Sequence, residues 1–525
     1  MQNTLTLPPI FQSNMVLQRQ KPIRIWGRGP ALCSVKAAFN GAEASALTGE
    51  DGHWELRLPP MEASGGGRLE LFCGGEAACS FDSVAVGEVW IAGGQSNMEF
   101  ALRYDRRRRE VFARPPDPLL RYFEVPKLSW EGQREGDPFT GGDFASQGLW
   151  LGFSRKNAPL FSAAAYYFAA RLREKLGVPV GIISCNWSGV PAFAWIAEDM
   201  LRADGETAPF WNEYYDRIKT QDPAAYEKAF DKAHAEGWSP LMRGAFDLYM
   251  RGRIPIVLGD ILKKIDPGFL DLQLMGPRDP WRPCGLYSTM VRTVEGYTCR
   301  GVIWYQGEGD DLRPGYYARL FALVIRGWRR AWGEELPFVF AQLAAFGRDH
   351  FQRGDAFPEL RRQQELAAES TAKTWMVCTM DLGERYNIHP GNKGPVGERL
   401  ATAALAAVYG LDLPWRSPRA EGVSRGDGGE LRVRFGGCDG GLEIRGPRIK
   451  GLRLFDRGAE ARKFQARTEG DTLLILPDRI GGADEICYAW EPYTEVNLFD
   501  GAGFPALPFR LTEDPSSPWG AEKQS

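Results

Sequence analysis

The chain has 525 residues, more than a single hydrophobic core usually supports, so we expect several structural units. Hydrophobic residues make up 44% and charged residues 25% of the sequence, which is typical of globular proteins and excludes a disordered or fibrous chain. A formal net charge of −3 offers no basic surface to phosphate groups, so we expect no nucleic-acid partner.

The first part of the chain, residues 1–85, predicts a small β-sandwich. Its opening residues, MQNTLTLPPIFQSNMVLQ, lack a basic segment followed by an apolar run, so we expect no secretory signal. No stretch reaches transmembrane length, and the two features together predict a cytoplasmic protein without a membrane partner. Short alternating segments broken by Gly and Pro then occur at 16–18, 23–26 and 54–58.

An α/β domain is predicted for residues 86–410. Apolar runs typical of buried strands occur at 89–92, 180–184, 301–305, 338–343 and 376–380. Segments of helical period alternate with them. One follows the capping residue Ser162 and ends at Gly177, a second carries Tyr317 and Trp328, and a third stops at Gly410. This alternation is the signature of βα units around a mostly parallel sheet.

Two further segments complete the predicted organisation. Residues 196–283 are irregular, rich in aromatic residues, Gly and Pro, and too long for a loop, so we interpret them as an insertion near the functional site. Alternating strands return at 431–435, 451–455, 472–475 and 485–490. They predict a β-rich C-terminal unit over residues 411–515, with a tail at 516–525.

Polar clusters follow four of the predicted strands. They are residues 93–98 (GGQSNM), 186–191 (NWSGVP), 306–311 (QGEGDD) and 381–390 (DLGERYNIHP). Ligands of open α/β sheets bind beyond the carboxyl ends of the strands, where loops present side chains on a rigid base. We therefore expect these clusters to form one site. A plain turn of Gly, Ser and Asn is the alternative interpretation of the first cluster taken alone.

The first and last clusters contain a candidate nucleophile and a candidate base. Two glycines allow a tight turn that would expose Ser96 above the sheet. A serine hydroxyl needs a base, and histidine has a suitable pKa near neutrality. Of four histidines, His389 is the best placed and His350 is its rival, whereas His53 and His234 lie in other parts of the chain. A histidine that only caps a helix or packs under a loop is the structural alternative.

Acyl transfer also needs hydrogen-bond donors for the developing oxyanion. The backbone N–H of Ser96, the backbone N–H of Gly189 and the side-chain amide of Gln306 are the candidates. Each has an ordinary structural explanation when taken separately, and it is their joint occurrence at successive strand ends that favours a catalytic site. Nine cysteines without CxxC pairs favour reduced, mostly buried thiols over a disulfide framework or a zinc site.

Segments over most of the chain resemble the sialate O-acetylesterase group of SGNH hydrolases. In that group GQSNM, WGG-P-AW, WYQGES and IHP-NK recur in this order, and here the corresponding segments are GEVWIAGGQSNMEF, GIISCNWSGVPAFAWI, GVIWYQGEGDD and NIHPGNKGPVGERLA. The β-rich flanks, MVLQRQKPIRIWG and VNLFDGAGFPALPFR, are also similar to that group.

The resemblance implies both a fold and an activity. The fold is a flavodoxin-like, three-layer α/β SGNH-hydrolase domain with a parallel sheet, flanked by β-sandwich units. The activity is that of a serine esterase removing acetyl groups from carbohydrates without a metal or other cofactor. The implied nucleophile is Ser96, the implied base His389, and the implied oxyanion donors Ser96, Gly189 and Gln306.

The sequence departs from the family pattern at two positions. Asn387 replaces the Asp that many members carry two residues before the histidine, so the group that orients the imidazole is open. Either a backbone carbonyl near Asn387 accepts the Nδ1 proton, or an acid reaches the ring, the candidates being Glu308, Asp310, Asp381 and Glu384. Gly309 stands where a serine is common, which predicts a looser loop.

Two other functions remain open at this stage. The same machinery could act on longer acyl esters or thioesters. A glycan-binding protein with a degenerate hydrolase core is the non-enzymatic alternative, which the departures at Asn387 and Gly309 motivate. The sequence does not identify the acetylated sugar, its ring position or the oligomeric state.

Overall fold

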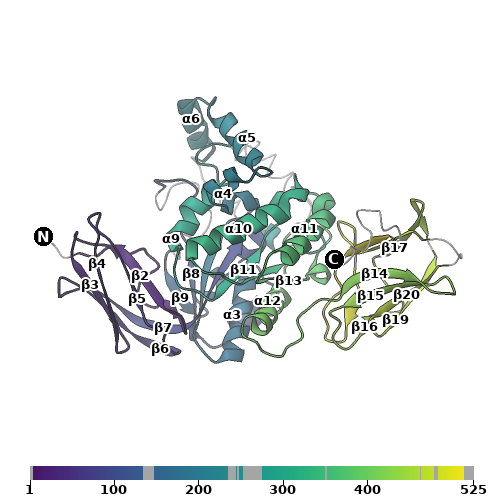
Figure 1. The fold of residues 1–525 in the computed structure, drawn as a ribbon, viewed down its shortest axis with the longest axis horizontal. Helices are drawn as coiled ribbons and strands as arrows, with labels where there is room; N and C mark the ends of the chain where they lie inside the picture. The colour runs from purple at the N-terminus through teal and green to yellow at the C-terminus, as the bar shows by residue number, and fades with distance from the viewer. Residues whose placement is uncertain are drawn as a thin grey trace.

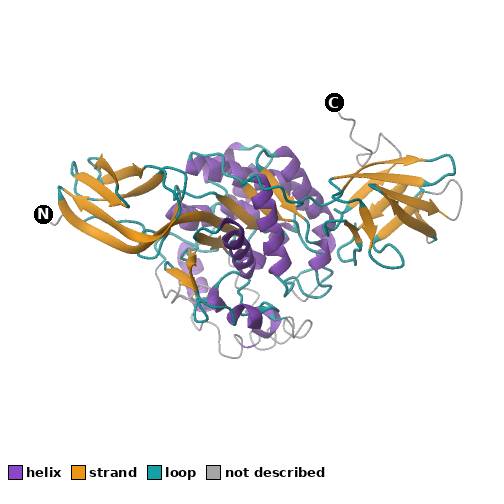
Figure 2. Ribbon diagram, turned by 90° about the horizontal axis from the view of Figure 1, so that it is seen from below, coloured by secondary structure: helices purple, strands orange, loops and turns teal. Residues whose placement is uncertain are grey.

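A computed structural model places a central α/β core between two β-rich units, which lie at opposite ends of the molecule (Figure 1). It describes residues 4–133, 147–234, 244, 247–251, 275–348, 352–461, 463–477 and 483–512. Strands dominate both ends, and helices surround the strands of the centre (Figure 2). The arrangement is a mixed α/β fold with separate β-rich sheets, as the sequence predicts at this level.

The N-terminal unit shares a strand with the core. Its strands are β1 (Val16–Gln18), β2 (Ile23–Arg28), β3 (Ser34–Phe39), β4 (Ala42–Leu47), β5 (His53–Leu58), β6 (Ser64–Cys73) and β7 (Glu76–Gly94). The first half of β7 pairs with β6, and its last seven residues pair with a strand of the core. The boundary expected at residue 85 therefore falls within one continuous strand, which couples the two units rigidly.

The central sheet has the strand order β13-β12-β11-β7-β10-β8-β9. The core strands after β7 are β8 (Asp117–Glu124), β9 (Trp150–Phe153), β10 (Val180–Asn186), β11 (Gly301–Tyr305), β12 (Phe338–Ala341) and β13 (Thr374–Val377). All pairings from β13 to β8 are parallel, and β9 adds an antiparallel edge. From β7 the chain adds strands on one side of the sheet, up to β10, and then crosses to the other side to form β11, β12 and β13. In open sheets of this kind, ligands bind at such a switch point, which here lies between β7 and β11.

Two pairs of helices cover the sheet. The core helices are α1 (Ser96–Glu99), α2 (Arg108–Phe112), α3 (Ala163–Leu176), α9 (Arg292–Val294), α10 (Tyr317–Trp332), α11 (Phe357–Ser370) and α12 (Gly394–Ala407). Figure 1 draws α10 and α11 above the central strands, and α3 and α12 below them. The expected cap of α3 is confirmed, because the Ser162 hydroxyl accepts from the Ala165 N–H at 3.1 Å and Gly177 ends the helix at φ 67°.

Helices form the described part of the predicted insertion. They are α4 (Glu198–Ala203), α5 (Ala208–Ile218) and α6 (Pro223–His234). In Figure 1, α5 and α6 project from the core as a separate lobe. Tyr214, Tyr226 and Phe230 are buried, so these aromatic residues serve the core of the lobe.

The C-terminal unit consists of β14 (Arg419–Arg425), β15 (Leu431–Gly436), β16 (Leu442–Ile444), β17 (Leu452–Asp456), β18 (Ala459–Ala461), β19 (Phe464–Glu469), β20 (Thr472–Pro477), β21 (Glu485–Tyr488), β22 (Leu498–Asp500) and β23 (Phe509–Thr512). Its hydrophobic cluster includes Ala345, Cys378 and Met380 from the α/β core. The unit is therefore packed firmly on the core. The tail predicted at 516–525 lies outside the described residues.

Four of the five predicted core strands agree closely with the structure, and the fifth is displaced. The apolar run at 376–380 predicts a strand, but β13 ends at Val377 and a 3-10 helix begins at Met380. Cys378 and Met380 are apolar because they pack against the C-terminal unit and not because they continue the strand. The pattern alone does not separate these two causes.

No helix within the described ranges is both long and apolar enough to cross a membrane. All nine cysteines are free thiols, and six of them are buried.

Candidate active site

Ser96 lies directly beyond the carboxyl end of β7, as the first residue of α1. A Cβ on Gly93 would meet the Trp304 ring at 2.6 Å, and one on Gly94 would meet the Tyr305 carbonyl oxygen at 2.2 Å. Only glycine therefore lets β7 end so close to β11. Ser96 itself is nearly closed to solvent, with 7% of the residue exposed.

Gln95, the residue before Ser96, holds the loop that follows β11. Its Oε1 accepts the backbone N–H groups of Gly307 at 3.3 Å and Gly309 at 3.0 Å. Its own backbone N–H donates to the Tyr305 carbonyl at 3.0 Å. The first and third polar clusters of the sequence are thus joined, as expected from their positions at neighbouring strand ends.

Asn97, the residue after Ser96, joins two segments of the site. They are the turn at residues 93–98, called the nucleophile turn after its candidate nucleophile, and residues 381–390, called the histidine loop. Its Nδ2 donates to the Ile388 carbonyl at 3.0 Å and to the Glu308 carboxylate, and its Oδ1 accepts from Lys393 Nζ at 2.5 Å. Asn97 and Ile388 are 291 positions apart in the chain. The Asn97 side chain therefore holds the segments that carry Ser96 and His389 next to each other.

His389 is buried, and so is its ring nitrogen Nδ1. Its backbone N–H donates to Asn387 Oδ1 at 2.9 Å, and its ring meets that of Tyr249 edge to face. Nδ1 has no hydrogen-bond partner among the described residues, so neither a backbone carbonyl near Asn387 nor one of the candidate acids is bound to it in this structure. Burial, and secondarily the charge of Lys393, lower the pKa of His389 to about 3. The ring is therefore neutral at neutral pH, as a general base requires.

The Ser96 hydroxyl and the His389 ring, both within the described ranges, form no hydrogen bond in this structure. Catalytic hydrogen bonds are often long without substrate and tighten in the complex. The structure thus brings the two segments together without completing the contact between their side chains.

Two of the four candidate acids are committed to arginines. Asp381 forms a bidentate ion pair with Arg399 at 2.6 and 2.7 Å. Glu384 pairs with Arg106 at 2.9 Å and accepts from Asn387 Nδ2 at 3.3 Å. Each oxygen of these two carboxylates is already bound to another group, so both are poorer candidates for the orienting acid than a carboxylate with an unbound oxygen.

Asp310 is committed to the loop after β10. Both of its carboxylate oxygens accept the Ala192 backbone N–H, at 3.1 and 3.2 Å, and one also accepts from Gln306 Nε2 at 2.5 Å. Burial raises the pKa of Asp310 to about 7. Its role in this structure is to fix backbone, and it does not orient a ring.

Glu308 is the candidate acid with a free oxygen. It is 2% exposed, and one carboxylate oxygen accepts from Asn97 while Oε2 has no partner within the described chain. Burial raises the pKa of Glu308, whereas the Asn97 hydrogen bond and the charge of Lys393 oppose that rise. Burial lowers the pKa of Lys393 to about 7, against the effect of Glu308. Glu308 Oε2 and His389 Nδ1 are thus two unsatisfied atoms in segments that Asn97 connects.

Two of the predicted oxyanion donors, Gly189 and Gln306, lie in loops that contact each other, but Gln306 is occupied. Gly189 has φ 76°, and the loop that carries it contacts Gln306, whose Nε2 donates to the Val190 carbonyl at 3.2 Å and to Asp310. Both amide hydrogens of Gln306 are therefore engaged, and its Oε1 has no partner in the described part of the chain. As placed, Gln306 holds the Gly189 loop against the loop after β11.

Gly309 does not loosen its loop, contrary to the expectation from the family pattern. Its N–H is bound by Gln95, and a Cβ there would meet the Val190 carbonyl carbon and oxygen at 2.8 Å and the Gly189 oxygen at 2.9 Å. The missing side chain permits close contact with the loop of the predicted oxyanion donor. The position is tight and not flexible.

Gly309→Ala is expected to lower kcat for ester hydrolysis by roughly ten- to a hundredfold, because the new methyl group displaces the Gly189 backbone from its position. Steady-state kinetics on p-nitrophenyl acetate measures the effect. Gly315→Ala is the matched control, since a Cβ at Gly315 has open space around it. Equal kcat for both variants would contradict the role of Gly309.

The other histidines are not part of this constellation. His53 is exposed in β5 of the N-terminal unit, and His234 ends α6. His350, the sequence-based rival of His389, lies outside the described residues. In the chain as described, no group of three His, Cys, Asp or Glu side chains is arranged to hold a metal ion.

Asn97 and Lys393 are the residues that sequence analysis missed. Both are fully buried and polar, and Lys393 also lies over the rings of Phe100 at 4.8 Å and Tyr305 at 5.5 Å. They are inside the segments GGQSNM and IHPGNKG, so a signal existed. What the sequence did not show is that their side chains bind each other.

Comparison with known proteins gives consistent results. Residues 278–406 match a family model described as "Carbohydrate esterase, sialic acid-specific acetylesterase". A sialate O-acetylesterase of Rattus norvegicus is 26% identical over 441 residues, covering 77% of this chain and 74% of the relative. The Homo sapiens sialate O-acetylesterase is 23% identical over 450 residues, covering 79% and 73%.

A solved structure is similar over nearly the whole chain. The crystal structure of a carbohydrate acetylesterase from Xanthomonas citri superposes with a TM-score of 0.74 at 28% sequence identity, covering 97% of this chain and all of the other. The similarity includes the β-rich flanks as well as the α/β core, and the resemblance seen in the sequence is confirmed.

Proposed function

From the premise that this chain is a carboxylic ester hydrolase related to the sialate O-acetylesterases, we propose that it hydrolyses O-acetyl esters of carbohydrates through an acyl-enzyme on Ser96. The observation that carries the proposal is the Asn97 side chain, which ties the Ser96 turn to the residue before His389. We place this chemistry on a three-layer, SGNH-type core with a parallel sheet, in a cytoplasmic protein.

The first half-reaction acylates Ser96. The Ser96 oxygen attacks the acetyl carbonyl while the neutral His389 ring accepts the hydroxyl proton. The developing oxyanion accepts from the backbone N–H groups of Ser96 and Gly189. Gln306 becomes a third donor only by releasing Val190 or Asp310, and otherwise it positions the Gly189 loop. The imidazolium then gives its proton to the sugar oxygen, which leaves as an alcohol.

The second half-reaction returns the enzyme to its starting state. His389 takes a proton from water, the hydroxide attacks the acetyl carbonyl, and acetate leaves as the proton returns to Ser96. In both steps the Glu308 carboxylate accepts a hydrogen bond from the N–H at His389 Nδ1 and stabilises the imidazolium. The buried ammonium of Lys393 favours the ionised form of Glu308, and Asn97 fixes the orientation of both.

The acyl-chain preference tests the acetyl assignment. The nucleophile turn is closely packed, so we expect p-nitrophenyl acetate to be hydrolysed roughly tenfold or more faster than the octanoate ester, with butyrate between them. Values of kcat/KM on the three esters measure this, and acetate release from acetylated sugars extends it to carbohydrates. Preference for octanoate would favour the alternative of a long-chain esterase or thioesterase.

A further inference from the structure

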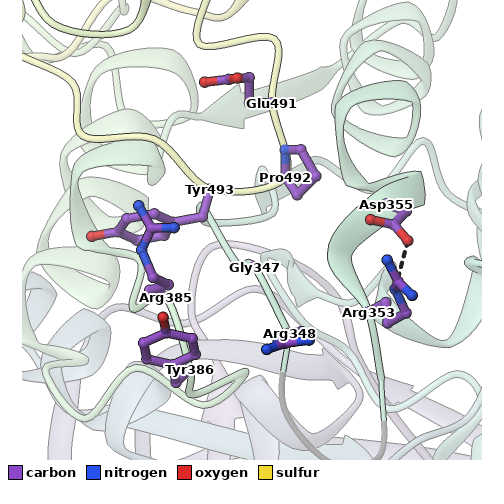
Figure 3. A pocket seen from close by; sticks show the side chains of 9 residues that line it. All are labelled: Gly347, Arg348, Arg353, Asp355, Arg385, Tyr386, Glu491, Pro492 and Tyr493. Atoms are coloured by element: carbon purple, nitrogen blue, oxygen red, sulfur yellow. Dashed lines mark ion pairs between the residues drawn. The ribbon is translucent and has the colours of Figure 1, made fainter.

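A pocket of about 360 Å³ opens beside the histidine loop, between the α/β core and the C-terminal unit (Figure 3). The loop after β12 supplies Arg348 and Arg353, the histidine loop supplies Arg385 and Tyr386, and the C-terminal unit supplies Tyr493. Figure 3 shows these side chains around one opening, with Arg385 stacked on Tyr493. Its volume is within the range of small-molecule sites.

Among the described residues that line it, the pocket has more arginines than acids. Its two acids are each paired: Asp355 with Arg353 at 2.8 Å, and Glu491 with Arg453 at 3.1 Å. Within the described ranges, Arg348 and Arg385 form no ion pair with a carboxylate. Arg385 lies over the Tyr493 ring at 4.6 Å, and the pKa of Glu495 is lowered mainly by Lys450 and to a smaller degree by the charge of Arg385. Two guanidinium groups in the pocket are therefore available to an anion.

Backbone contacts connect the pocket to the active site. The Arg385 carbonyl accepts from the N–H groups of Gly347 at 3.1 Å and Arg348 at 3.2 Å. Arg385 precedes His389 by four residues, which span at most about 14 Å of extended chain. Gln352, the residue before Arg353, donates through Nε2 to the Glu308 carbonyl. The pocket is thus next to the catalytic loops.

Packing makes the pocket preformed. The Phe346 N–H donates to the Pro492 carbonyl at 2.9 Å, and the buried Arg361 donates to the Glu491 carbonyl at 2.5 Å. Ala345 lies in the hydrophobic cluster of the C-terminal unit. The relative positions of the three walls are therefore set before any ligand arrives.

We propose that this pocket binds a carboxylate-bearing sugar residue attached to the acetylated one in an oligosaccharide. Arg348 and Arg385 would bind the carboxylate through charge-assisted hydrogen bonds, and the half-exposed Tyr386 would pack against the sugar ring. The inference rests on the proposed function for the place of the acetyl group. It adds a role for the C-terminal unit in selecting acidic glycans.

The test compares two acetylated xylo-oligosaccharides that differ only in a glucuronic acid branch. For the double variant Arg348→Gln/Arg385→Gln we expect KM for the acidic oligosaccharide to rise about tenfold more than KM for the neutral one, since the lost ion contacts act on binding. The control is Arg353→Gln. This variant removes an arginine of the same pocket, but one that is already paired with Asp355. It should therefore keep the ratio of the two KM values within about twofold.

Two results would overturn the subsite. They are an unchanged ratio of KM values in the double variant and an equal change in Arg353→Gln. Hydrolysis of p-nitrophenyl acetate by the unsubstituted enzyme tests the proposed function separately. Calorimetric titration of each protein with the deacetylated acidic oligosaccharide tests the subsite even without hydrolysis, and binding that is absent, or equal in the double variant and the unsubstituted protein, would also refute it.

Discussion

Ser96→Ala is expected to reduce kcat for p-nitrophenyl acetate by about six orders of magnitude, the size of effect that removal of a nucleophilic serine has in a triad enzyme. The variant lacks the oxygen that forms the acyl-enzyme, and the residual rate would come from the oxyanion donors alone. Because the serine hydroxyl forms no hydrogen bond with the residues that the structure describes, the variant should keep its circular dichroism spectrum and melting temperature.

A nearby serine provides the control for this prediction. Ser188 is exposed next to Gly189, and its hydroxyl donates to Glu99 at 2.8 Å. A fluorophosphonate probe should label the unsubstituted enzyme and Ser188→Ala, and leave Ser96→Ala unlabelled. Peptide mapping that places the adduct on another residue would refute Ser96 as nucleophile. No adduct at all on the unsubstituted enzyme would support the glycan-binding alternative.

The periodicity of the sequence predicted most of the core, because buried parallel strands and amphipathic helices leave strong local patterns. It predicted β10, β11 and α3 nearly to the residue, including the Ser162 cap. It did not predict that β7 would continue through residue 85. Whether a long β-rich segment turns or continues depends on pairing with distant strands, which no local pattern records.

The candidate site, like the fold, was predicted from the sequence only in part. Positions at strand ends were enough to predict that Ser96 and His389 would lie in adjoining loops. The choice among four acids was not available from the sequence, since it depends on which carboxylates are already bound. Arg399 binds Asp381 and Arg106 binds Glu384, and the second of these pairs joins residues 278 positions apart in the chain.

Glu308→Gln is expected to lower kcat by about four orders of magnitude with little change in KM, which is the effect of an amide in place of the orienting carboxylate of a triad. The glutamine keeps the shape of the side chain and can still accept from Asn97 through its oxygen. It then presents an NH₂ group where Oε2 lies, so the imidazole must place its proton on the wrong nitrogen. Single-turnover kinetics on p-nitrophenyl acetate would locate the loss in acylation.

Glu384→Gln and Asn387→Ala separate this role from general damage to the histidine loop. Glu384 lies in that loop but pairs with Arg106, and within the described residues the Asn387 side chain is hydrogen-bonded to the backbone N–H of His389 and to Glu384. We expect each to lose less than about tenfold in kcat, because neither side chain reaches the ring. If Glu384→Gln lost as much as Glu308→Gln, the acid would have been assigned wrongly. If Glu308→Gln retained full activity, His389 would act without an orienting carboxylate, and the unsatisfied Nδ1 would need another explanation.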